Sequence, residues 1–144
     1  MISIQNPDAN LEGLRPATIP EEHHLVLLFK DRDEVDHERS PQRHHVETLV
    51  SWLKGLDRAD LSGLLVHCDA GVSRSTACAW LALVVLEPAG SADEHLKRVE
   101  HCAGSAYCWP NPAIAELGDE VLGSGSELSE SLARWKAAQN DRKW

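Results

Sequence analysis

Short apolar runs alternate along this chain with longer segments in which apolar residues recur at helical spacing. The runs at residues 24–29 (HLVLLF) and 64–67 (LLVH) have the length and continuous apolar character of buried parallel strands. Residues 2–4 (ISI) form a shorter strand candidate near the beginning of the chain. The segment from residue 6 to 20 carries three prolines and is expected to be a loop.

Five segments have the pattern of helices. The first opens at Pro41, and its apolar residues recur at helical spacing from Val46 to Leu56. The third begins at Ser91, with Glu94 three residues later, which is the sequence signature of a capping box. The expected helices are residues 41–56, 73–86, 91–102, 111–122 and 127–139.

The alternation of strands and helices predicts an α/β fold with a mostly parallel central sheet flanked by helices. A chain of 144 residues has the usual size of one domain and can bury a core, so residues 1–144 are expected to form a single domain. In parallel sheets, sites form at the carboxyl ends of the strands. Cys68 lies at such a position, directly after the strand expected at 64–67.

The charge of the chain excludes some partners. With 23 acidic and 14 basic residues, the net charge is −9, which disfavours general binding of nucleic acid or of an anionic membrane. The first residues are mixed and polar, unlike a signal peptide, and the longest apolar run, Ala77 to Leu86, is too short to span a bilayer. We therefore expect a cytoplasmic protein with reduced cysteines.

Residues 67–75 (HCDAGVSRS) carry the strongest functional signal. Between a strand and a helix, the backbone amides of this loop can surround an anion, aided by the helix dipole. Gly71 permits the tight backbone, and Arg74 can grip two phosphate oxygens. This setting favours a thiolate at Cys68 that attacks phosphorus, and Ser75 can donate a hydrogen bond to the sulfur when it leaves. The expected phosphate-binding residues are Asp69, Ala70, Gly71, Val72, Ser73 and Arg74.

A buried cysteine between a strand and a helix is often only a small apolar residue. The full pattern, His67-Cys68-x-x-Gly71-x-Ser73-Arg74-Ser75, resembles the protein tyrosine phosphatase superfamily, in particular its small dual-specificity-like branch and compact bacterial relatives. Further likeness lies in residues 2–4, 27–31, 110–111 and 117–123, so that it covers about residues 1 to 123.

The resemblance implies a cysteine phosphatase fold and hydrolysis of phosphomonoesters through a phosphocysteine intermediate, with protein phosphotyrosine or other phosphate esters as substrates. It also implies that the chain begins at the family's second strand, so that a first edge strand is missing. Other functions remain open. A rhodanese-like sulfurtransferase also uses a loop cysteine, and a non-catalytic phosphate-binding module would keep the same fold.

The resemblance also implies an aspartate that protonates the leaving group, in a loop upstream of the nucleophile. Asp31 directly follows the strand at 24–29 and is the preferred candidate, with Asp36 second and Asp33 third. The alternative is that this charged stretch is only a solvated loop.

Several neighbouring residues have supporting or uncertain roles. The resemblance implies that His67 tunes the nucleophile through hydrogen bonds of the loop, and that Asn111 braces the loop; Asn111 is also a helix-cap candidate. Asp69 departs from the family by placing a carboxylate beside the nucleophile, and we expect it to point outward and influence substrate choice. Cys78 is expected to be a core residue, with a disulfide to Cys68 as the alternative.

The sequence predicts no metal site and no cofactor, because its histidines and cysteines lack the spacing of zinc ligands. The expected partner is a phosphorylated protein or a small phosphate ester, with no nucleic acid and no membrane. A chain of this length predicts a shallow pocket by analogy with larger relatives. Oligomeric state is not indicated by the sequence.

Overall fold

The computed structural model describes residues 1–35 and 38–141. These residues form one α/β domain with a small sheet of three parallel strands. The strands are β1 (Ile2–Gln5), β2 (Leu25–Leu28) and β3 (Val66–His67), in the order β2-β1-β3. In the central strand, Ile2 and Ile4 are completely buried, as expected for a strand with a neighbour on each side.

The described residues also contain five α-helices. They are α1 (Arg43–Gly55), α2 (Arg74–Leu86), α3 (Ala92–Ala103), α4 (Pro112–Leu122) and α5 (Glu127–Asp141). Three single turns of 3-10 helix, η1 (Glu21–His23), η2 (Arg58–Asp60) and η3 (Ser105–Tyr107), interrupt the connecting loops.

Helix α2 lies at the centre of the domain. It packs against α1, α3 and α4 and against strands β1 and β3. Its sequence is apolar or small on nearly every side, which is typical of a helix surrounded by other elements. The indole of Trp80 is buried there, and its Nε1 donates a hydrogen bond to the carbonyl of Ala92 at 2.9 Å. The element that follows the proposed phosphate loop is therefore held firmly in the core.

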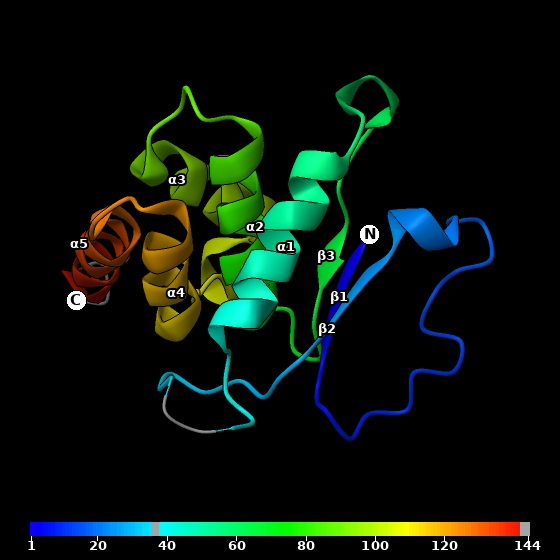
Figure 1. Ribbon diagram of the computed structural model, residues 1–144. Coiled ribbons are helices and arrows are strands. Elements are labelled where there is room, and N and C mark those ends of the chain that lie inside the picture. The colour runs from blue at the N-terminus through cyan, green and yellow to red at the C-terminus, as the bar shows by residue number, and fades with distance from the viewer. Residues whose placement is uncertain (36–37, 142–144) are drawn as a thin grey trace.

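The helices are gathered on one side of the sheet. Figure 1 shows α1 and α2 next to the strands and the remaining helices beyond them, while the loop of residues 6–20 lies on the opposite side. The expected α/β fold with a parallel sheet and helices packed against it is confirmed, and the α-helices lie on one side of the sheet. The connection from β1 to β2 contains only the proline-rich loop and η1, and thus provides no α-helix for the second side.

The expected helices form close to their predicted boundaries. The capping box of α3 is confirmed, because Ser91 Oγ accepts from the amide of Glu94 while Glu94 Oε2 accepts from the amide of Ser91. The strand expected at 64–67 is shorter than predicted, since only Val66 and His67 pair with β1. None of the helices in the described part of the chain combines the length and apolar character required to cross a membrane.

Candidate active site

Cys68 lies directly after β3, and its sulfur is held from two directions. The amide of Gly71 donates to Sγ at 3.3 Å, and Sγ itself contacts the hydroxyl of Ser75, also at 3.3 Å. The residue is 8% exposed. The loop thus brings a nearly buried sulfur together with a backbone donor and a hydroxyl, as the sequence pattern predicted.

The loop ends at the N-terminus of α2, and its backbone is adapted to this turn. Gly71 has φ +71°, a left-handed conformation that favours glycine. Ser73, the N-cap of α2, makes no side-chain capping bond to the helix. The first amides of a helix have no intrahelical acceptor, so the beginning of α2 presents donors and the positive end of the helix dipole near Cys68.

Arg74 is buried and connects three parts of the chain. Its Nη1 donates to the carbonyl of Phe29 at 2.9 Å and to Oδ1 of Asn6 at 3.2 Å, and its Nη2 donates to Asp69 at 2.8 Å. Among the residues that the structure describes, its Nε has no hydrogen-bond partner. A buried donor without a partner is costly, so this nitrogen is a suitable position for an oxygen of a bound anion.

The prediction for Asp69 is wrong in direction. Its carboxylate is turned back onto the guanidinium of Arg74, with Oδ2 also accepting from Nδ2 of Asn6 at 3.2 Å. The side chain of Asp69 is about half exposed, whereas that of Arg74 is buried. The ion pair therefore lies at the surface end of the arginine. Coulomb attraction to the only cation of the loop outweighs the full hydration that an outward carboxylate would retain. Asp69 therefore competes with any anion for Nη2.

Asp31 lies beside the loop rather than alone in solvent. Its Oδ1 accepts from the hydroxyl of Ser73 at 2.6 Å and from Nδ2 of Asn111 at 2.9 Å. The side chain is nevertheless exposed, which leaves it accessible to a substrate. Of the other acid candidates, Asp33 is exposed and makes no hydrogen bond to the loop within the described part of the chain, and Asp36 lies outside the described residues.

Asn111 connects three elements. It is completely buried, caps α4 by accepting from the amide of Ile114, and donates to Asp31 and to the carbonyl of Arg32. The bracing and capping roles considered for it are therefore both present.

His67 points to the sheet rather than to the loop. Its Nε2 is 2.6 Å from the hydroxyl of Ser3, which also contacts Nε2 of His24 at 2.8 Å. The predicted role of His67, tuning the nucleophile through the loop, thus has no bond to support it here. The histidine instead joins β3 to β1 next to the nucleophile, and this fixes the position from which the loop begins.

Sequence reasoning missed Asn6, which follows β1 and contacts both Arg74 and Asp69. A signal was present, since the carboxyl ends of parallel strands meet at one edge of a sheet. Asn6, Asp31 and Cys68 follow β1, β2 and β3 in that way. Two further loop residues were expected to bind phosphate. The carbonyl of Val72 accepts a hydrogen bond from the amide of Trp109, and Ala70 is exposed.

All four cysteines are free, and they differ in their surroundings. Burial raises the pKa of the Cys78 thiol to about 12, and burial also raises that of Cys108 to about 12. Neither thiol is a nucleophile near neutral pH. Cys102 is exposed on α3 and makes no hydrogen bond to the loop among the described residues. Cys68 is thus the cysteine placed for chemistry, and no group of three or more potential metal ligands occurs in residues 1–35 and 38–141.

The chain matches no known protein-family model, and comparisons with curated proteins and with solved structures found no significant match either. The resemblance to the tyrosine phosphatase superfamily thus stays a prediction. What the structure provides is a cysteine, an arginine, two hydroxyls and a carboxylate on and beside one loop, held by separate sets of hydrogen bonds around Cys68, Arg74 and Asp31.

Proposed function

We propose that this protein is a cysteine-dependent phosphomonoester hydrolase of the tyrosine or dual-specificity type, with a cysteine phosphatase fold. The observation that carries the proposal is the position of Cys68 Sγ, which contacts both the Gly71 amide and the Ser75 hydroxyl at the beginning of α2. A thiolate is stabilised by such donors and by the helix dipole. The proposed substrates are phosphorylated proteins or small phosphate esters, and the expected compartment is the cytoplasm.

The proposed reaction has two steps. The Cys68 thiolate attacks phosphorus, the S–P bond forms, and the P–O bond to the leaving group breaks while Asp31 donates its proton to the departing oxygen. Water then attacks the phosphocysteine, its proton passes to the Asp31 carboxylate, and the sulfur leaves as a thiolate. The Ser75 hydroxyl donates a hydrogen bond to that thiolate, inorganic phosphate is released, and both the sulfur and the carboxyl group return to their initial state.

Arg74 would bind the phosphoryl oxygens through Nε and Nη2. In the structure Nη2 is occupied by Asp69, so binding of a phosphate requires Asp69 to share or release this nitrogen. Because Nη1 is fixed to Phe29 and Asn6, the guanidinium keeps its orientation while that exchange takes place. A guanidinium group whose orientation is already fixed is what electrostatic stabilisation of a transition state requires.

The direct test is hydrolysis of p-nitrophenyl phosphate. We expect wild-type activity that vanadate inhibits and that Cys68→Ser reduces by more than about a thousandfold, because the nucleophile is lost. Cys102→Ser is the matched control, since Cys102 is exposed on α3 and makes no hydrogen bond to the loop among the described residues, and should retain full activity. Absence of hydrolysis by the folded wild type, or full activity of Cys68→Ser, would contradict the proposal.

A non-catalytic phosphate-binding module is the second candidate, because Asp69 already neutralises part of Arg74. It predicts that the folded wild type binds vanadate or phosphate without hydrolysing any ester. Sulfur transfer from thiosulfate to cyanide, measured as thiocyanate, would instead support the rhodanese-like alternative.

A further inference from the structure

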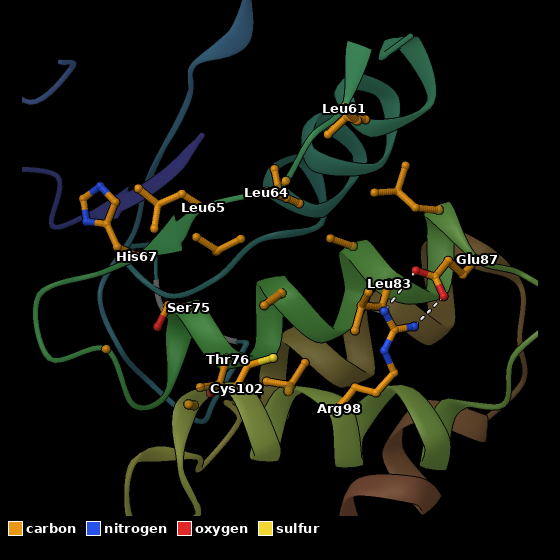
Figure 2. Close-up of a pocket in the computed structure, with 18 of the residues that line it drawn as sticks. Leu61, Leu64, Leu65, His67, Ser75, Thr76, Leu83, Glu87, Arg98 and Cys102 are labelled. Atoms are coloured by element: carbon orange, nitrogen blue, oxygen red, sulfur yellow. Dashed lines mark hydrogen bonds and ion pairs between the residues drawn. The ribbon is translucent and has the colours of Figure 1, made fainter. Parts of the chain in front are cut away.

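A cavity of about 810 Å³ opens between the β3 segment and helices α2 and α3, and at one end it reaches Gly71 and Ser75 of the proposed active-site loop. Its walls are mainly apolar. Leu64 and Val66 line it from the strand side, Ala79 and Leu83 from α2, and Val99 from α3. Figure 2 shows this groove between the strand segment that ends at His67 and the two helices, with Glu87 and Arg98 at the far end.

Strand β3 has one paired edge and one open edge. It is the last strand in the sheet order, and the amide of Ile2 on β1 donates to the carbonyl of Leu65 at 2.8 Å. In a parallel strand, successive residues direct their backbone N–H and C=O groups to opposite sides. Since Leu65 faces β1, the backbone groups of Leu64 and Val66 are directed to the open edge, which borders the groove.

An open edge beside an apolar groove is the arrangement that binds an extended peptide as an added strand. The helix layer already extends beyond the sheet, because α3 lines the groove although no strand in the described residues covers it. A lipid or other apolar small molecule would fill the groove but would leave the backbone groups of Leu64 and Val66 without partners. The edge therefore favours a polypeptide.

The charges at the groove indicate which kind of polypeptide. Its charged lining residues are Arg58, Arg98 and Glu87, of which Arg98 donates to both carboxylate oxygens of Glu87. Arg58 leaves an excess positive charge there, whereas the whole chain carries −9. The local charge fits an acidic group, and the charge of the molecule opposes pairing with a second copy.

We propose that this groove binds an extended, apolar segment of a partner protein as a fourth strand along β3. The segment's alternate side chains pack on α2 and α3, and an acidic residue at one end lies near Arg58. This interaction surface adjoins the loop of Cys68, since Gly71 and Ser75 also line the cavity, but strand addition along β3 does not depend on hydrolysis and holds whether or not the protein is a phosphatase.

The probe for this site is a fluorescein-labelled synthetic peptide of alternating valine and threonine with a pair of glutamates at one end. We expect saturable binding to the full-length protein in fluorescence anisotropy. Methylation of alternate backbone nitrogens in the peptide should abolish binding, because it removes the donors that pair with a strand edge. Equal binding of the methylated peptide would overturn strand addition in favour of simple apolar occupancy.

Two leucines on opposite edges of the sheet provide matched variants. Leu65 borders the groove and is 59% exposed, whereas Leu28 on the outer edge of β2 is 36% exposed. Leu65→Lys should weaken peptide binding by about tenfold or more, and Leu28→Lys should leave it unchanged. The opposite ranking, or no saturable binding by the folded wild type, would overturn the proposal.

Cys102 gives a second readout, because it is exposed and lines the groove. In the Cys68→Ser background, the peptide should slow alkylation of Cys102 by iodoacetamide, while the methylated peptide should not. Sedimentation should give a monomer for the unliganded protein. A dimer that Leu65→Lys dissociates would instead identify a second copy as the occupant and overturn the assignment to a different partner.

Discussion

Asp69 is the residue that limits how strongly the loop can bind an anion. Its carboxylate lies 2.8 Å from the guanidinium of Arg74, in the place where a phosphoryl oxygen would bind. The sequence identified this residue as unusual, but the expectation that it points outward was wrong, since neighbouring residues in a loop can point to either side. The third participant, Asn6, is far away in the sequence, so the contact depends on the fold.

The first prediction at this scale concerns Asp69→Asn. The substitution keeps the shape of the side chain and removes the charge that competes for Nη2. We expect vanadate to bind about tenfold more tightly and KM for p-nitrophenyl phosphate to fall about tenfold, with kcat changed much less. Inhibition titrations and steady-state kinetics measure both. Weaker vanadate binding by the variant would show instead that Asp69 is needed to orient Arg74.

A second prediction concerns Asp31→Asn. Loss of the proton donor should reduce kcat by about a hundredfold or more for phenyl phosphate, a poor leaving group, and much less for p-nitrophenyl phosphate, whose leaving group needs little protonation. A phosphocysteine should still form and can be trapped by acid quench with labelled substrate. Asp33→Asn, in the same charged loop, is the control and should retain wild-type kinetics for both esters.

At the scale of single elements, local signals in the sequence were sufficient for the helices. The Ser91–Glu94 pair predicted the beginning of α3, and both of its bonds are present. Local signals in the sequence were insufficient for β3, because only tertiary pairing with β1 determines how much of an apolar run becomes a strand. The cap of α5 was also missed. It comes from Asp119 on the preceding helix, which no pattern within α5 reveals.

Asp119 gives a prediction about stability. Burial of its carboxyl group opposes ionisation, but bonds from Ser124, Leu128 and Ser129 outweigh this effect and lower its pKa. The folded-state pKa therefore lies below the unfolded value of about 3.9, so the stabilisation is complete above that pH and is lost as the pH falls through the folded-state pKa.

We expect Asp119→Asn to reduce the free energy of unfolding by about 2 kcal/mol near neutral pH, and by progressively less below about pH 4. Urea denaturation at several pH values measures the difference. Ile114→Val, in the core of α4, should cost about 1 kcal/mol at every pH. If the difference in the free energy of unfolding between Asp119→Asn and the wild type did not change with pH, the charge of Asp119 would contribute nothing to stability.

For the whole molecule, the single α/β domain and its parallel sheet were predictable, because alternating strands and helices allow few other arrangements. The position of the α-helices on one side of the sheet was not predictable. A continuous apolar strand is compatible with helices on either side, and only the absence of an α-helix between β1 and β2 decides between them. The groove at the edge of β3 was equally invisible, since an unpaired edge has no pattern of its own.

The total charge of −9 leads to a prediction at the same scale. Under the proposed function, the protein repels a phosphate dianion at long range and binds it at the loop that contains Arg74. Raising the salt concentration from about 20 mM to about 200 mM should therefore increase kcat/KM for a dianionic ester, by about twofold. A phosphopeptide with flanking lysines should show the opposite trend. Slower hydrolysis of the dianion with added salt would show that local positive potential dominates instead.

The anchoring of Arg74 to Phe29 and Asn6, and of Asp31 to Asn111, has a consequence for biosynthesis. Cys68 emerges from the ribosome before Asn111 and before α2 can pack into the core. Until those later segments are in place, Cys68 lacks the surroundings that the proposed reaction requires. Under the proposed function, hydrolysis at Cys68 therefore begins only when the domain is complete.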